Sequence, residues 1–147
     1  MSSSIDKNII PVVAVVILDK SSDHFLIVRR AENQSGAGFW EFPGGKIEII
    51  DGVFESQTQA LAREINEELG LTVSENQLQF LISYKHAYAL KTIYISFYLL
   101  AVDQAVSLTL IDHDLFAWCK IEDLFNYQIA AADISVIEHL KKIVKIK

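Results

Sequence analysis

The chain has 147 residues, of which 51% are apolar and 10% aromatic. This length fits a single domain over residues 1–147, and this apolar content suffices for a sizeable core, which excludes a disordered polypeptide. With 19 acidic against 13 basic residues the net charge is −6, a sign that disfavours binding long nucleic acid through its phosphates. The longest apolar runs are too short to cross a bilayer, so no membrane partner is expected.

The N-terminus lacks the pattern of a signal peptide, because no basic segment is followed by an apolar stretch and a cleavage site. We therefore expect a cytoplasmic protein whose residues 1–8 are flexible. The one cysteine, Cys119, has apolar neighbours and is predicted to be a buried small side chain. The chain is expected to be a monomer or a homodimer.

The chain begins with a predicted hairpin. Residues 12–18 and 24–30 are rich in β-branched and large apolar side chains, and a polar turn lies between them. The segments that follow are predicted, in order, to be a loop, a short apolar segment, a glycine turn and a second turn: residues 32–38, 39–42, 43–45 and 51–52.

A helix is predicted over residues 57–69, where apolar side chains recur every four positions. Ser56 is its expected N-cap, and Gln59 completes a capping box. Gly70 is expected to end the helix.

The second half of the chain is predicted to contain three strands followed by two helices. Strands are predicted at residues 78–84, 92–102 and 115–121, a short helix near 122–125 and a terminal helix from about 134 to 144. This order of elements predicts an α/β (α+β) fold in which a mixed sheet is packed between helices.

Three carboxylates lie on one face of the central helix. Glu64, Glu67 and Glu68 stand at positions i, i+3 and i+4. Like charges at this spacing destabilise a helix unless a cation lies among them, and oxygen ligands suit Mg²⁺, with Mn²⁺ as the alternative. Taken alone, the cluster is better explained as a solvated acidic face in which Arg63 pairs with Glu67.

Residues upstream change that interpretation. Gly44, Gly45 and Lys46 supply a tight turn followed by a cation suited to phosphate. With Glu55 before the helix, the pattern resembles the Nudix box: Gly, five residues, Glu, seven residues, Arg-Glu, aliphatic, any, Glu-Glu, any, Gly, aliphatic. Glu55 and residues 63–71 satisfy every position after the first glycine.

The departure from the box lies between Gly45 and Glu55, which are separated by nine residues rather than five. We place the four extra residues in an exposed loop over residues 49–54, because closure entropy grows slowly with loop length. We therefore expect the loop between Gly45 and Glu55 to differ in shape from that of the family. The helix that carries the glutamates is expected to be unchanged.

The resemblance extends to MutT-like pyrophosphohydrolases that act on 8-oxo-dGTP and pyrimidine nucleoside triphosphates. Residues 28–31 and 40–48 carry it most clearly, and looser likeness brings in most of residues 10–141. The resemblance implies a Nudix fold and a Mg²⁺-dependent enzyme. Its substrate would be a small nucleotide, hydrolysed to a nucleoside monophosphate and pyrophosphate.

The resemblance also implies roles for single residues. The implied metal ligands are Gly45, Glu64, Glu67, Glu68 and Asp112, of which Asp112 is equally well explained as an ordinary turn residue. The implied catalytic group consists of Glu64, Glu67, Glu68 and the orienting Arg63, with Glu55 as a support. The implied substrate contacts are Arg30, Glu41, Lys46, Tyr88 and Asp133.

Some of these positions have a structural alternative. Arg30 and Lys46 would also be explained as solvated cations, and Tyr88 as packing. Asp133 precedes the terminal helix, so it is either a contact to the nucleobase or an N-cap, or both. His113 is expected on the surface, since the site is an oxygen site.

Two other functions compete with this interpretation. A nucleotide-binding regulatory module on a Nudix fold is the alternative to an enzyme, but the complete set of three helix glutamates argues against it. A P-loop NTPase is excluded because Trp40 and Ile47 occupy positions where that motif needs Gly and Ser or Thr.

Overall fold

The structure, a computed structural model, describes residues 9–144, so the flexibility predicted for residues 1–8 lies outside the described part. Its strands are β1 (Ile9–Asp19), β2 (His24–Arg30), β3 (Trp40–Glu41), β4 (Gly44–Lys46), β5 (Ile49–Ile50), β6 (Val53–Phe54), β7 (Gln79–Ala87), β8 (Thr92–Val102) and β9 (His113–Lys120). Its α-helices are α1 (Gln57–Leu69) and α2 (Ile134–Val144). Short 3-10 segments are η1 (Glu75–Gln77), η2 (Ile121–Asn126) and η3 (Ala131–Asp133).

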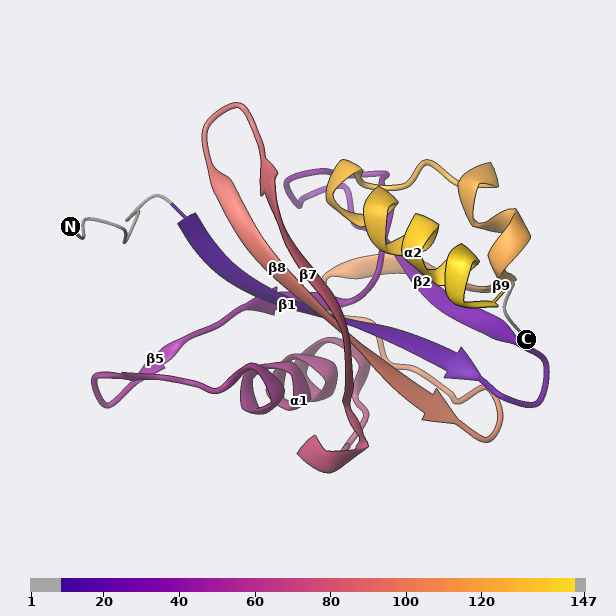
Figure 1. Cartoon of the computed structure of the whole chain (residues 1–147), viewed down its shortest axis with the longest axis horizontal. Coiled ribbons are helices and arrows are strands. Elements are labelled where there is room, and N and C mark those ends of the chain that lie inside the picture. Colours follow the sequence, from indigo (N-terminus) through magenta and orange to yellow (C-terminus); the bar gives the residue numbers. More distant parts are fainter. Residues whose placement is uncertain (1–8, 145–147) are drawn as a thin grey trace.

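The long strand β1 runs through the middle of a seven-stranded sheet (Figure 1). The main path is β3-β2-β1-β8-β7, and β4 and β9 pair with β1 and β2 beside this path. β1 is parallel to β8 but antiparallel to β2 and β4. The predicted mixed sheet is therefore confirmed.

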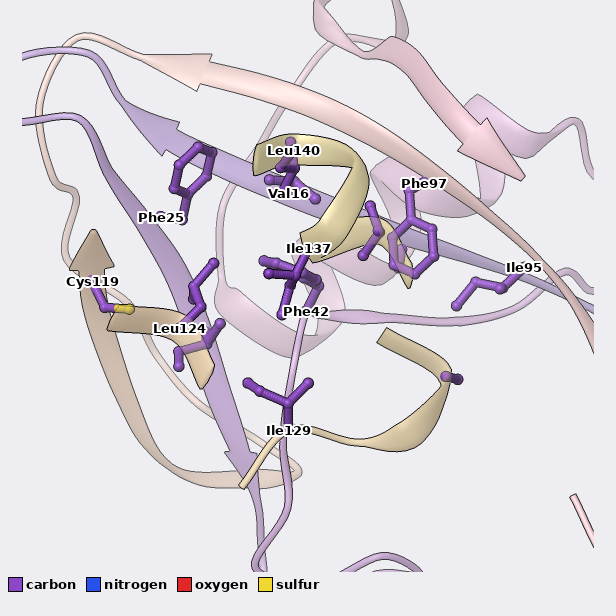
Figure 2. Packing of buried hydrophobic residues seen from close by; sticks show 14 of the residues in the cluster. Val16, Phe25, Phe42, Ile95, Phe97, Cys119, Leu124, Ile129, Ile137 and Leu140 are labelled. Atoms are coloured by element: carbon purple, nitrogen blue, oxygen red, sulfur yellow. The ribbon is translucent and has the colours of Figure 1, made fainter. Parts of the chain in front are cut away.

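Alternate residues of β1 serve two cores, one on each face of the sheet. Val13, Val15 and Ile17 belong to the core beneath α1. Ala14 and Val16 belong to the core beneath α2, where Figure 2 shows Val16 close to Ile137 and Leu140. Because β1 is buried on both faces, its sequence is a continuous apolar run. The helices α1 and α2 enclose the sheet, as predicted.

The central helix has the bounds that its capping signals predict. Ser56 Oγ accepts a hydrogen bond from Gln59 N (3.1 Å), and Gln59 Oε1 accepts one from Ser56 N (3.3 Å). Gly70 ends α1 with a φ of 72°, in the left-handed region. These local contacts confirm the predicted helix and its capping box.

The predicted glycine turn at residues 43–45 is wrong. Gly44 and Gly45 lie in β4, paired with Ala14 and Val13 of β1, and neither has a positive φ. A Cβ atom at Gly44 would collide with the Val13 carbonyl oxygen. Glycine is needed here for close approach of two strands rather than for an unusual backbone angle.

The four extra residues lie in a hairpin of β5 and β6, which projects from the body of the molecule (Figure 1). Glu55 N donates to the Glu48 carbonyl oxygen (2.9 Å) at the base of this hairpin. Its four apolar side chains, from Ile49–Ile50 and Val53–Phe54, are all exposed. The predicted exposed loop is confirmed, and it is ordered as a hairpin around Asp51-Gly52.

The later strands differ from prediction at their ends. β7 continues to Ala87, and β9 begins at His113 rather than at residue 115. The early start of β9 accompanies a register shift against β2 between Arg29 and Arg30. Among residues 9–144, no helix is long and apolar enough to cross a membrane.

Candidate active site

A cleft of about 810 Å³ opens between β4, the β7–β8 hairpin and the segment before α2. This volume lies within the range of roughly 300–1,000 Å³ that small-molecule sites occupy. The cleft brings together all the substrate contacts that the resemblance implied: Arg30, Glu41, Lys46, Tyr88 and Asp133. These residues come from strands and loops far apart in the sequence.

Gly45 joins this cleft to the acidic face of α1. It lines the cleft, and the Glu64 carboxylate packs so closely against it that a Cβ atom would collide with the carboxylate oxygens. The cleft floor therefore ends where the helix glutamates begin. Any larger residue at this position would displace Glu64.

Arg63 organises three of the carboxylates. Its Nε and Nη2 donate to the two oxygens of Glu55 (2.8 and 2.7 Å), and its Nη1 donates to Glu64 (2.7 Å) and Glu67 (2.9 Å). The guanidinium group lowers the pKa of the buried Glu55 carboxyl, which also accepts a hydrogen bond from Glu48 N (3.0 Å). The Arg63–Glu67 pair of the solvated-face interpretation is thus present, as one part of a larger network.

Glu68 is the buried acid of the cluster. It is 7% exposed, and its Oε2 atom has no hydrogen-bond partner in the described part of the chain. Burial raises its pKa to about 8, with further contributions from the charges of Glu64, Glu41 and Asp112. Asp112 therefore lies near enough to Glu68 to act on it electrostatically.

The oxygen donors around Glu68 fit a divalent cation. An unpartnered buried carboxylate oxygen among like charges is a site where a cation would relieve both desolvation and repulsion. Within residues 9–144, however, no three Asp, Glu, His or Cys side chains are already arranged around one metal position. Arg63 binds Glu64 through Oε1 only and Glu67 through both oxygens, so Glu64 Oε2 accepts no hydrogen bond within residues 9–144 and stays available to a cation with the Arg63 contact intact.

His113 is buried, which corrects the surface position expected from the sequence. Its side chain is 0% exposed, and Nε2 lies 2.9 Å from Glu41 Oε2. The cause is the register shift in β9, which alternation of polar and apolar residues does not reveal. Arg30 binds the same Glu41 oxygen (3.2 Å) and also the Ser35 carbonyl oxygen (2.6 Å).

Asp133 is not the N-cap of α2. Its Oδ2 accepts a hydrogen bond from Phe42 N (2.8 Å), and burial, followed by the charge of Glu41, raises its pKa well above the ordinary value. The Tyr84 hydroxyl takes the capping role, because it accepts a hydrogen bond from Val136 N (3.2 Å) and donates to the Ala132 carbonyl oxygen (2.6 Å). Asp133 is thus bound to the cleft wall.

Two side chains at the cleft rim remain accessible. Tyr88 is 41% exposed and packs edge-on against His86, with ring centroids 4.7 Å apart. Lys91 lies over the Tyr88 ring, 5.6 Å from its centroid. Lys46 is exposed at the other end, where its carbonyl oxygen accepts a hydrogen bond from Arg63 (3.2 Å).

Known proteins share the sequence pattern and the fold of this chain. The family model described as NUDIX domain matches residues 13–139. The CTP pyrophosphohydrolase of Escherichia coli (strain K12) is 33% identical over 129 residues, 88% of this chain and 89% of that protein. The 8-oxo-dGTP diphosphatase of Proteus vulgaris is 40% identical over 94 residues, 64% of this chain and 78% of that protein.

A solved structure agrees with these sequence relatives. The crystal structure of the MutT protein from Methanosarcina mazei Go1 superposes with a TM-score of 0.80 at 25% identity, covering 97% of this chain and 99% of that one. The chain belongs to the Nudix family. The resemblance carried by residues 44–71 is thereby confirmed, together with the predicted fold.

Proposed function

We propose that the chain is a MutT-like hydrolase that converts nucleoside triphosphates to nucleoside monophosphates and pyrophosphate. The observation that carries this proposal is the junction at Gly45, where a nucleotide-sized cleft meets the acidic face of α1. The names of the relatives, CTP pyrophosphohydrolase and 8-oxo-dGTP diphosphatase, agree with hydrolysis of a phosphoric anhydride bond.

Nudix hydrolases generally depend on a divalent metal, and we propose Mg²⁺ here, with Mn²⁺ as the alternative. The residues that would hold it are Gly45, Glu64, Glu67, Glu68 and Asp112. When bound, the cation would neutralise phosphate oxygens and lower the pKa of a coordinated water. Arg63 would orient Glu64, and Glu55 would hold Arg63 in place.

The cleft residues would bind the phosphates and the base of the nucleotide. Lys46 and Arg30 supply positive charge for the phosphates in an otherwise acidic protein. Tyr88 offers an exposed aromatic ring for stacking on the base. Asp133 and Glu41 supply carboxyl oxygens for hydrogen bonds to the edge of the base. The proposed partner is thus a free nucleotide in the cytoplasm, bound by a monomer or a homodimer.

The proposal is tested with a panel of ribo-, deoxy- and 8-oxo-nucleoside triphosphates in the presence of Mg²⁺. Pyrophosphate and phosphate release are measured separately. We expect pyrophosphate and the monophosphate in equal amounts, with activity lost in EDTA and restored by Mg²⁺ or Mn²⁺. Release of phosphate alone, or no turnover of any triphosphate, would contradict the proposal.

Glu67→Gln and Glu68→Gln test the acidic site itself. Each replacement removes a charged oxygen with little change in volume, so we expect kcat to fall by orders of magnitude while the circular dichroism spectrum is unchanged. Glu138→Gln, an exposed change on α2, is the matched control and is expected to keep wild-type kcat. Near-wild-type turnover of both site variants at saturating Mg²⁺ would remove the metal-site interpretation.

A further inference from the structure

His113 combines complete burial with a single polar partner. Its side chain is 0% exposed, Nε2 contacts Glu41, and Nδ1 is buried without a partner in the described part of the chain. A buried polar atom without a hydrogen bond destabilises the folded state, and an apolar side chain would avoid that loss. Stability therefore does not account for a histidine at this position.

The bulge in β9 is what directs His113 inward. The register against β2 shifts so that His113 lies opposite Arg30. The following residue, Asp114, instead binds Arg29 through two hydrogen bonds (2.9 and 2.8 Å) away from the cleft. Bulges commonly re-aim a side chain in this way. As a result, Arg30 and His113 converge on the same acceptor.

That acceptor is one oxygen of Glu41. Oε2 receives Arg30 Nη1 (3.2 Å) and lies 2.9 Å from His113 Nε2. Oε1 has no protein partner among the hydrogen bonds of residues 9–144, and Glu41 lines the cleft. Two donors from different strands thus anchor one oxygen and leave the other available.

We propose that His113 is a positioning residue for substrate specificity, donating Nε2–H to Glu41 Oε2 so that Oε1 is held ready to accept an N–H group of the nucleobase. This inference rests on the proposed function. The proton is assigned to Nε2 because the carboxylate there can only accept, whereas Nδ1 has nothing to donate to. Without His113, Glu41 keeps the Arg30 contact but loses the second anchor of its orientation.

Three variants test this role. His113→Leu removes both the donor and the unpartnered nitrogen, and His113→Gln keeps an N–H donor of similar reach. Ser96→Ala is the matched control, because Ser96 Oγ is likewise buried and unpartnered but Ser96 makes no hydrogen bond to Glu41. Each variant is measured for Tm and, across the nucleotide panel, for kcat and KM.

For His113→Leu we expect an unchanged or higher Tm and a KM raised about tenfold, the effect of losing one hydrogen bond to a charged group, with a much smaller change in kcat. His113→Gln is expected to recover most of the affinity, and Ser96→Ala to keep wild-type KM. In a Glu41→Gln background, His113→Leu should add little. A lower Tm with unchanged KM, or fully additive effects of the two substitutions, would overturn the inference.

Two further readouts keep this test separate from that of the proposed function. NMR of the imidazole nitrogens should show the proton on Nε2, with a shift that moves in Glu41→Gln, and a proton on Nδ1 would overturn the inference. If the wild-type protein hydrolyses no triphosphate, the proposed function fails. Calorimetric titration with nucleoside monophosphates then makes the same comparison, and equal affinity in wild type and His113→Leu would overturn the positioning role.

Discussion

Glu68 is a carboxyl group placed where a negative charge is unfavourable. Its pKa is about 8 in the folded protein, against 4.5 as its ordinary value, mainly because it is buried. Between these two pH values the folded state keeps a proton that the unfolded state has lost. The free energy of unfolding of the metal-free protein should therefore fall as the pH rises from about 4.5 to about 8.

Glu68→Gln tests this linkage, because glutamine resembles the protonated acid at every pH. The Tm of this variant should match wild type near pH 4.5 and exceed it near pH 8. In a chain of this size, each kcal/mol of added unfolding free energy raises the Tm by roughly 2–4 °C. Mg²⁺ should raise the wild-type Tm more at pH 8 than at pH 6, since it favours the ionised acid. Parallel Tm profiles for the two proteins would contradict the buried acid.

The β5–β6 hairpin is separable from the site that it adjoins. Its base is closed by the hydrogen bond from Glu55 N to the Glu48 carbonyl oxygen (2.9 Å). Asp51 and Gly52 at its tip have φ values of 52° and 78°, which suit a two-residue hairpin turn. The hairpin can therefore be shortened to Glu48-Asp51-Gly52-Glu55, which leaves five residues between Gly45 and Glu55.

Deletion of Ile49, Ile50, Val53 and Phe54 together makes this change. We expect an unchanged fold and metal dependence, because Glu55 keeps its contact with Arg63 and the deleted side chains are 48–67% exposed. Thermal unfolding and the metal dependence of kcat check this, with serine at the four positions as the full-length control. Loss of the folded state on deletion alone would show that the hairpin supports the site.

Local signals explain what could be predicted from the sequence. The bounds of α1 and the position of the extra loop depend on neighbouring residues such as Ser56 and Gly70, so pattern alone finds them. The burial of His113 depends on a bulge, and the cap of α2 depends on Tyr84, 52 residues before Val136. Contacts of this range leave no periodic trace in the sequence.

The cleft depends on contacts between distant parts of the chain. Asp133 Oδ2 binds Phe42 N across 91 residues of sequence, where the segment before α2 meets the entry to β4. The bond is buried, so both partners would be left unsatisfied without it. It ties the wall that carries the proposed base contact to the strand that leads to Gly45.

Asp133→Asn and Asp133→Ala separate this structural bond from base recognition. The amide oxygen of asparagine can still accept from Phe42 N, and losing a buried carboxyl with a raised pKa removes a source of instability at neutral pH. The Tm of Asp133→Asn at pH 7 should therefore equal or exceed wild type. Asp133→Ala should lose about 1–3 kcal/mol, because Phe42 N is left buried and unpaired.

The same asparagine variant should change the ranking of nucleobases. Its amide nitrogen is a permanent donor, whereas the carboxyl group donates only when protonated, so bases that offer an acceptor gain relative to those that offer N–H groups. The measurement is kcat/KM across the nucleotide panel at fixed Mg²⁺. If every base keeps its wild-type proportion, Asp133 serves only the bond to Phe42, and base selection belongs to Glu41 and Tyr88.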